Sequence, residues 1–210
     1  MNAQRLDLDT WPGADQFRFF KTYGRPHFAV TSRMDASRLM EAKASRGISP
    51  FRAVIWAIGH ALHAVPELRT RFRGDAVTRY ERLRLSPTVP LESGDFRFTY
   101  LDWTEDRAAF DAHAATEIDR IRAGQPLNPN DPARQDVAFL SCLPWLDYTA
   151  LDNALPDAED CIPRVGWGKI VDQGGGCREM AMTIQVHHAL VHGRHVGAFF
   201  SGVQSALDAL

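Results

Sequence analysis

Gln185-Val186-His187-His188-Ala189-Leu190-Val191-His192-Gly193 is the stretch that decides the fold of this chain. Before it, apolar and polar residues alternate over 180–186, which is the two-residue period of a β-strand. After it, apolar residues recur at helical spacing over 196–207. Two adjacent histidines therefore stand where a buried strand ends, just before a glycine turn and a closing helix.

His188 is the first candidate for chemistry. Side chains alternate along a strand, so His187 and His188 are expected on opposite faces, with His188 on the apolar face of Val186. Partial loss of water there disfavours the charged imidazole, and a neutral imidazole is what a general base requires at neutral pH. A strand-end histidine is more often structural, but the paired histidine and the following glycine at a sheet edge favour a base.

The spacing of His188, His192 and His195 raises a metal site as an alternative, because residues four apart meet on one helical face. Gly193 and the strand before His188 argue against a continuous helix. No Cys, Asp or Glu stands near enough in sequence to complete a ligand shell. We therefore predict no metal, and keep a metal-dependent hydrolase as a third hypothesis that stoichiometric zinc would support.

Ser141 is the second candidate, at the end of a strand predicted over 136–142. It lacks the GxSxG setting of a hydrolase nucleophile. Its functional interpretation is a hydroxyl donor to a developing oxyanion, worth ~3 kcal/mol, and its structural alternative is a turn hydroxyl. Apolar neighbours predict that Cys142 is a buried, unreactive thiol. His60 and His63 fall within a predicted helix as structural or surface residues.

Composition limits the classes of protein. The 210 residues are 45% apolar, which fits one domain over 1–210 with a sizeable core. A net charge of −2 without a basic run argues against nucleic acid. No apolar stretch is long enough to cross a membrane, no signal peptide opens the chain, and three cysteines lack a CxxC pair. We therefore expect a cytoplasmic protein with a small-molecule partner, no nucleic acid and no membrane.

Helices and strands mix along the chain without regular alternation, which favours helices layered on a mixed or mostly antiparallel sheet. Caps and stop residues predict one helix from Asp35 to Gly47, one from Ser49 to Pro66 and one from Thr104 to Gly124. Strands are predicted at 27–32, 76–85, 96–102, 136–142, 165–171 and 180–186. A proline-rich loop at 125–134 is long enough to be functional.

These residues resemble the chloramphenicol acetyltransferases, a family of antibiotic-resistance enzymes. The run 185–197 is similar to the HHxxxDG signature of that family and of related acyl-CoA-dependent acyltransferases. The segment 140–145, Leu-Ser-Cys-Leu-Pro-Trp, resembles the family's Ser-x-x-Pro-Trp segment. Trp11 with Phe17, and the Glu67-Leu68-Arg69 run, extend the resemblance over nearly the whole chain.

The resemblance implies a two-layer α+β sandwich of helices on a large mixed, mostly antiparallel sheet. It implies a homotrimer with its active site at the subunit interface, and acetyl-CoA as co-substrate. His188 would take the proton of an acceptor hydroxyl, and Ser141 would hydrogen-bond the tetrahedral oxyanion. The resemblance also implies contacts to the two substrates: Lys169 near the coenzyme, and Phe20, Phe96 and Arg164 near the acceptor.

Two departures from the family bear on activity. The aspartate of HHxxxDG is His192 here, and the arginine that pairs with it in the family corresponds to Gly13. Losing one half of a buried pair costs ~3–5 kcal/mol, whereas losing both can leave the fold intact. The pair is expected to hold the turn that orients the histidine. Arg164 and Phe20 replace an apolar residue and a tyrosine, which predicts an acidic or polar acceptor rather than chloramphenicol.

Two functions of different classes follow from these residues. The first is an O-acetyltransferase, supported by the intact His188 and Ser141. The second is a catalytically impaired homologue that binds a small molecule or acyl-CoA without turnover, because His192 and Gly13 loosen the turn. Release of free thiol from acetyl-CoA distinguishes the two.

Overall fold

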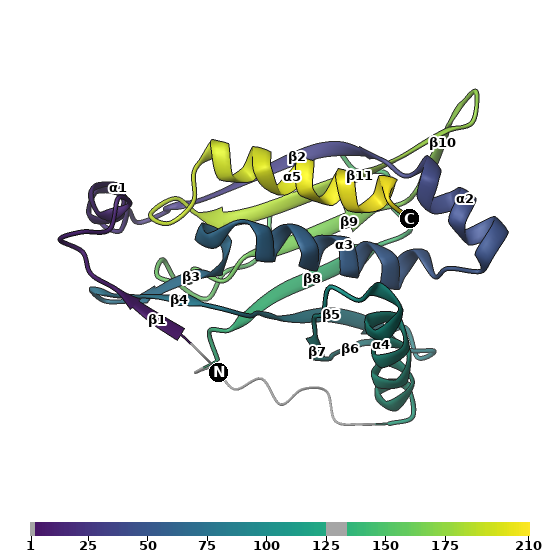
Figure 1. Ribbon diagram of the computed structural model, residues 1–210, viewed down its shortest axis with the longest axis horizontal. Helices are drawn as coiled ribbons and strands as arrows, with labels where there is room; N and C mark the ends of the chain where they lie inside the picture. The colour runs from purple at the N-terminus through teal and green to yellow at the C-terminus, as the bar shows by residue number, and fades with distance from the viewer. Residues whose placement is uncertain (1–2, 125–133) are drawn as a thin grey trace.

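The computed structural model describes residues 3–124 and 134–210 (Figure 1). The helices are α1 Ala14–Phe20, α2 Ser37–Arg46, α3 Pro50–Ala64, α4 Arg107–Arg122 and α5 Gly193–Asp208, with a 3-10 helix, η1, at Pro66–Arg69. The strands are β1 Ala3–Leu6, β2 His27–Asp35, β3 Thr70–Arg73, β4 Ala76–Tyr80, β5 Arg84–Pro90, β6 Phe96–Phe98, β7 Leu101–Asp102, β8 Val137–Leu143, β9 Arg164–Gly168, β10 Val171–Gly174 and β11 Cys177–His187. None of these helices is long and apolar enough to span a membrane.

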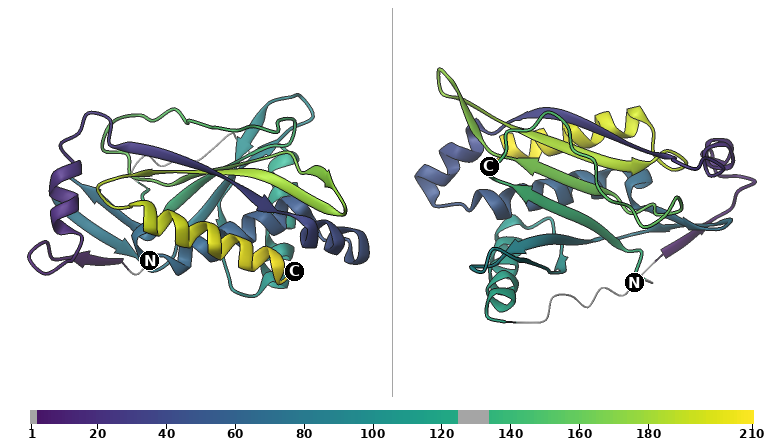
Figure 2. Two further views of the ribbon diagram at one scale, coloured as in Figure 1. Left: turned by 90° about the horizontal axis from the view of Figure 1, so that it is seen from above. Right: turned by 180° about the vertical axis from the view of Figure 1, so that it is seen from behind.

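One large sheet organises the molecule. Its strand order is β10-β11-β9-β8-β5-β6, with β2 added on β11 and β7 on β5. The β5–β8 and β8–β9 pairs are parallel and the other pairs are antiparallel. Helices α3 and α5 lie side by side on one face of this sheet (Figures 1 and 2). This arrangement confirms the predicted two-layer α+β sandwich on a mixed, mostly antiparallel sheet.

Strand β11 is buried on both faces rather than on the single face that its alternation predicts. Every residue from Met180 to His187 is buried. The helices cover one face, and the irregular segment after β8 covers the other. Polar residues are tolerated there because they are hydrogen-bonded: Thr183 Oγ1 lies 2.7 Å from Thr31 Oγ1, and Gln185 Oε1 accepts from the backbone N–H of Asn153 at 2.8 Å.

The predicted elements differ from the structure at several boundaries. The strand expected at 76–85 is two strands, β4 and β5, and β3 was not predicted. Strand β4 is the middle strand of a second sheet of order β1-β4-β3, and the chain passes from it to β5 of the large sheet where the Arg69 guanidinium donates to the carbonyls of Tyr80 and Glu81. Asp106 rather than Thr104 caps α4, because its carboxylate accepts from two first-turn N–H groups. The predicted strand at 165–171 divides into β9 and β10, and the predicted loop at 125–134 lies outside the described residues except for Arg134.

A buried arginine ties β3 to the large sheet. Arg71 is 2% exposed and donates to four carbonyls, those of Leu68, Thr70, Gln135 and Val137. Burial lowers the pKa of Arg71, and the carbonyl oxygens replace the water that its guanidinium has lost. The sequence Thr-Arg-Phe-Arg does not by itself predict such a strand, because two of these carbonyls, those of Gln135 and Val137, come from a distant segment.

Candidate active site

His188 opens the turn between β11 and α5, one residue beyond the end of the strand. Its N–H donates to the Pro26 carbonyl at 2.9 Å, and its carbonyl accepts from Gln16 Nε2 at 2.6 Å. The N–H groups of Leu190 and Val191 both donate to the carbonyl of residue 187 at 3.1 Å. The backbone of His188 is therefore fixed from three directions, with α1 supplying one of them.

The His188 ring is half-buried between two aromatic rings. It stacks on Phe20 with centroids 3.9 Å apart and an interplanar angle of 7°, and Phe28 lies at 4.8 Å. Its Nδ1 lies 3.1 Å from the Val191 carbonyl oxygen. A carbonyl can only accept, so Nδ1 carries the proton and Nε2 keeps its lone pair. This tautomer suits a base that acts through Nε2.

His187 contacts a different set of residues and has a structural role. Its Nδ1 accepts from the Ala189 N–H at 3.1 Å, and its Nε2 donates to the Ala158 carbonyl at 2.9 Å. Phe72 packs edge-on against the ring. Burial lowers the pKa of His187 to about 4, so this ring stays neutral and held on both nitrogens. Of the two adjacent histidines, only His188 retains a ring nitrogen for chemistry.

The two positions that depart from the family pattern are filled in other ways. His192 is the N-cap of α5, and its ring lies 3.8 Å from that of His195. A Cβ on Gly13 would lie 2.3 Å from the Trp11 indole, so no side chain fits there unless Trp11 moves. His188 and His192 do not share a helical face, since α5 begins after both. Among the described residues, no three His, Cys, Asp or Glu side chains are grouped so that they could hold a metal ion.

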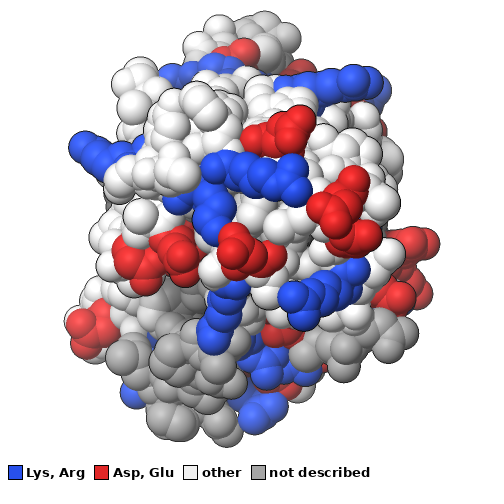
Figure 3. Space-filling view, turned by 90° about the vertical axis from the view of Figure 1, so that its left-hand side faces the viewer, with Lys and Arg blue, Asp and Glu red and all other residues white. Residues whose placement is uncertain are grey.

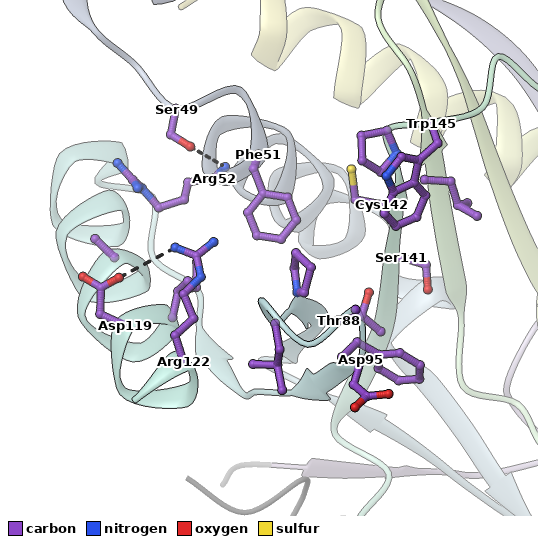
Figure 4. A pocket seen from close by; sticks show the side chains of 18 residues that line it. Ser49, Phe51, Arg52, Thr88, Asp95, Asp119, Arg122, Ser141, Cys142 and Trp145 are labelled. Carbon is purple, nitrogen blue, oxygen red and sulfur yellow. Dashed lines mark hydrogen bonds and ion pairs between the residues drawn. The ribbon is translucent and has the colours of Figure 1, made fainter. Parts of the chain in front are cut away.

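Ser141 lies on β8, where two cavities of about 650 Å³ each meet. Thr88 and Phe96 line both cavities with it. The first cavity is mainly apolar, with two guanidinium groups at its rim (Figure 4). Its wall includes Phe51, Arg52, Ile118, Arg122 and Trp145. Within the described ranges, the Ser141 hydroxyl has no hydrogen-bond partner, so it remains available to a ligand.

The second cavity contains Arg164, but not as a free cation. Its guanidinium makes two hydrogen bonds to the Asp160 carboxylate, at 3.1 and 2.7 Å, and lies 5.4 Å over the Phe139 ring. Burial is the largest single influence on Asp160 and opposes its ionisation, but the hydrogen bonds and charge of Arg164 together with the Ile162 N–H and His27 hold the pKa of that carboxyl below its usual value. The cavity therefore gains no net charge from this pair, which removes the reason for expecting an acidic acceptor.

Cys142 lies in the first cavity beside Ser141. Burial raises the pKa of its thiol to about 12. The thiol stays protonated at neutral pH, so Cys142 is unreactive, as its apolar sequence setting predicts.

The predicted site residues fall into two groups within one protomer. His188 and Phe20 are in contact, and Ser141, Phe96 and Arg164 line common cavities. Neither of the two cavities at Ser141 includes His188, in the part of the chain that the structure describes. Helix α1 beside His188 lies at one end of the long axis, whereas helix α4 beside the first cavity lies in the other half of the molecule (Figure 1). Lys169 is exposed and lines neither of these cavities.

The end of the molecule that carries α1 has a mixed surface. Lysine and arginine side chains are interspersed there with aspartate and glutamate (Figure 3). Lys21 pairs with Asp75, and Arg18 with Asp15 at 3.3 Å. This face therefore has no large patch of one charge to steer a ligand.

Sequence reasoning missed two contacts at this turn, one of Gln16 with the His188 carbonyl and one of His195 with the N-cap of α5. Gln16 has no motif around it, since its contact joins positions 172 residues apart. His195 had a signal: it stands three residues after the N-cap, the spacing of a capping box, and its Nδ1 accepts from the N-cap N–H at 3.3 Å.

A family model described as chloramphenicol acetyltransferase matches residues 1–204. The chain belongs to the chloramphenicol acetyltransferase family. Similar relatives include the chloramphenicol acetyltransferase of Staphylococcus aureus, 23% identical over 99% of this chain and 97% of its own length, and chloramphenicol acetyltransferase 3 of Escherichia coli, 22% identical over 100% and 99%.

Solved structures agree on the fold of this chloramphenicol acetyltransferase family member. A chloramphenicol acetyltransferase superposes with a TM-score of 0.86 at 24% identity, covering 98% of this chain and 100% of that one. The cubic core of the pyruvate dehydrogenase multienzyme complex superposes with a TM-score of 0.68 at 16% identity, covering 93% and 86%. The architecture is thus shared with a wider group of proteins, and family membership supports acyl transfer as the activity.

Proposed function

We propose that this protein is an acetyl-CoA-dependent O-acetyltransferase that acts on a small-molecule alcohol. The observation that carries the proposal is the His188 ring, stacked on Phe20, with Nδ1 donating to the Val191 carbonyl and Nε2 left as an acceptor. A fixed ring with one lone pair meets the geometric requirement for a general base.

The proposed reaction uses two side chains. His188 Nε2 takes the proton of the acceptor hydroxyl as the alcohol oxygen attacks the thioester carbonyl carbon. The Ser141 hydroxyl donates a hydrogen bond to the resulting oxyanion, a contribution of roughly 3 kcal/mol in comparable sites. Collapse of the tetrahedral intermediate breaks the carbon–sulfur bond, and the departing CoA thiolate takes the proton from His188.

The two cavities that meet at Ser141 fit the two substrates. The first has an apolar wall, which suits the pantetheine arm of a coenzyme, beside Arg52, which is paired with Asp111 at 2.7 Å, and Arg122, which lies 3.9 Å from Asp119. The second combines the rings of Phe96 and Phe139 with the Arg164–Asp160 pair, which suits a neutral alcohol with an apolar or aromatic part. We therefore assign the coenzyme to the first cavity. Lys169 lines neither cavity, so we place it outside the coenzyme site proper.

We infer that a complete site forms between two copies of the chain in a homotrimer, since His188 and Ser141 line separate parts of one protomer. Co-expression of His188→Ala and Ser141→Ala chains tests this, because mixed trimers would regenerate intact sites at some interfaces. Random mixing of equal amounts predicts recovery of about one quarter of the wild-type rate. Activity that stays at the level of the separate variants would contradict the shared site.

Removal of the base tests the reaction itself. His188→Ala is expected to lower acetyl transfer on the order of 10²–10⁴-fold, because general-base catalysis contributes that much. Coenzyme binding should persist, since His188 lines neither cavity at Ser141. The measurement is thiol release from acetyl-CoA with a panel of alcohols, alongside calorimetric titration of CoA. CoA binding without thiol release in the wild-type protein would instead support a binding protein without turnover.

A further inference from the structure

One peptide group joins two imidazole rings beside the proposed site. The Val191 carbonyl oxygen accepts from His188 Nδ1 at 3.1 Å, and the His192 N–H donates to His195 Nδ1 at 3.3 Å. This carbonyl and this N–H belong to the same planar amide. Rotation of that plane therefore changes both hydrogen bonds together. The orientation of the His188 ring thus depends on the hydrogen bond between His195 and the His192 N–H.

The two hydrogen bonds also fix the protonation of both rings. His188 must carry its proton on Nδ1, because its partner is a carbonyl. His195 must keep Nδ1 free to accept, so its proton lies on Nε2, which is 3.7 Å from Glu67 Oε2. Both side chains of this contact are mostly buried, 19% and 26% exposed. Glu67 comes from η1, so an element distant in sequence anchors the far side of the His195 ring.

We propose that His195, anchored by Glu67, is a positioning residue that holds the ring of His188 through the Val191–His192 peptide, and that it does so only as a neutral imidazole. This inference rests on the proposed acetyl transfer for its kinetic consequence. The hydrogen bonds themselves are independent of that activity. Hydrogen bonds to the two ends of one amide polarise each other, so the neutral His195 also strengthens the acceptor that fixes His188.

Protonation of His195 would break the link to His188, that is, the two hydrogen bonds that join the rings through the Val191–His192 amide. A charged imidazole donates from both nitrogens, so Nδ1 could no longer accept from the His192 N–H. Three ionisable groups face the ring: His192 and Arg194 oppose its charge, and Glu67 favours it. The partial positive charge at the start of α5 opposes it further. Burial, the largest influence, lowers the pKa of His195, so the link is closed at neutral pH and opens as the pH falls.

Three variants isolate this role. His195→Gln supplies an amide oxygen that can accept from the N-cap N–H, as in a capping box, but cannot titrate. His195→Ala removes the acceptor, and Glu67→Gln keeps the shape of the anchor without its charge. His113→Gln on α4 is the matched control, an exposed histidine far from the turn in sequence.

Two readouts are expected to respond. In ¹⁵N NMR of histidine-labelled protein, His188 should be the Nδ1–H tautomer in the wild type and His195→Gln, and a mixture in His195→Ala. The turnover number should fall roughly 10–100-fold in His195→Ala with KM for acetyl-CoA unchanged, because a small misplacement of a catalytic group costs that much. His195→Gln should restore turnover and make the acid limb of the pH profile shallower. Glu67→Gln should move that limb to lower pH, because it removes the carboxylate charge that favours protonation of His195.

The outcomes separate the two proposals. A His188 tautomer that is the same in His195→Ala as in the wild type, with an unchanged pH profile, would overturn the role of His195. Equal loss of turnover in His195→Gln and His195→Ala would overturn it as well. If the wild-type protein transfers no acetyl group while the His188 tautomer still follows residue 195, the proposed function fails and the positioning role stands.

Discussion

Ser141 stands where two cavities meet, with its hydroxyl unpaired among the described residues. Replacement by alanine should therefore leave the fold intact and remove only the proposed oxyanion donor. Ser141→Ala is expected to lower the turnover number roughly 10²–10³-fold, with coenzyme affinity retained. Steady-state kinetics with acetyl-CoA measure the effect, and Ser205→Ala, an exposed serine on α5, is the control. A loss of less than threefold would remove Ser141 from the reaction.

Residues His192 and Gly13 show how the aspartate–arginine ion pair of the family can be lost without leaving a buried charge unpaired. The Trp11 indole occupies the space beside Gly13, and His192 caps α5 next to His195. Neither position leaves a buried ion without a partner, which is the condition under which loss of both halves is tolerated. The sequence showed only that the aspartate and the arginine of the family are absent. The groups that took over these positions could not be predicted, because their contacts join separate segments.

At the scale of elements, two helical glycines offer a matched comparison. A Cβ on Gly59 of α3 would lie 2.2 Å from the Trp103 indole and 2.8 Å from Leu85, whereas one on Gly197 of α5 meets nothing within 4 Å. Gly59→Ala should lower the free energy of unfolding by about 1–3 kcal/mol through overpacking. Gly197→Ala should raise it by about 0.5–1 kcal/mol, since alanine is the better helix former. Urea denaturation at one protein concentration measures both, and a stabilised Gly59→Ala would contradict the packing.

Elements with local signals were predicted well. Helix α3 begins at Pro50 after the Ser49 cap and ends before Pro66, and α2 is closed by Gly47 in the left-handed conformation, as the sequence predicts. Elements that depend on distant contacts were not. Strand β3 is held by the hydrogen bonds of Arg71, and the division between β4 and β5 is held by Arg69. A period or a cap is encoded within a few residues, whereas these contacts exist only after the chain has folded.

For the whole molecule, the buried His187 and the half-buried His63 predict how stability changes with pH. Burial lowers the pKa of His63 and His187 from 6.5 to about 4. Between these values the unfolded chain binds protons that the native state does not. Their contribution to stability is therefore present above pH 6.5 and is lost as the pH falls toward 4, roughly 3 kcal/mol for the fully buried His187.

Thermal unfolding from pH 7.5 to 4.5 measures this slope. His187→Gln should flatten it, because the substituted side chain does not titrate, and His113→Gln should leave it unchanged. A melting temperature that is constant across this range would contradict the burial of these neutral rings.

The sequence names candidate residues for the site but not their arrangement in space. The motifs pointed to His188 and Ser141, and family resemblance suggested a site between subunits. The sequence gives no distance between the two residues, so their separation within one protomer became visible only in the fold.

The hydrogen-bonded amide between residues 191 and 192 has a practical consequence for mutational scanning. Any amino acid at 191 supplies the same carbonyl, and any except proline at 192 supplies the same N–H. An alanine scan would therefore leave this amide in place and report only the loss of the Val191 and His192 side chains, although the path from Glu67 to His188 passes between the two residues. Replacing that amide with an ester by chemical ligation would delete the N–H and weaken the carbonyl as an acceptor, so it would test the amide itself, which side-chain substitution at 191 leaves in place.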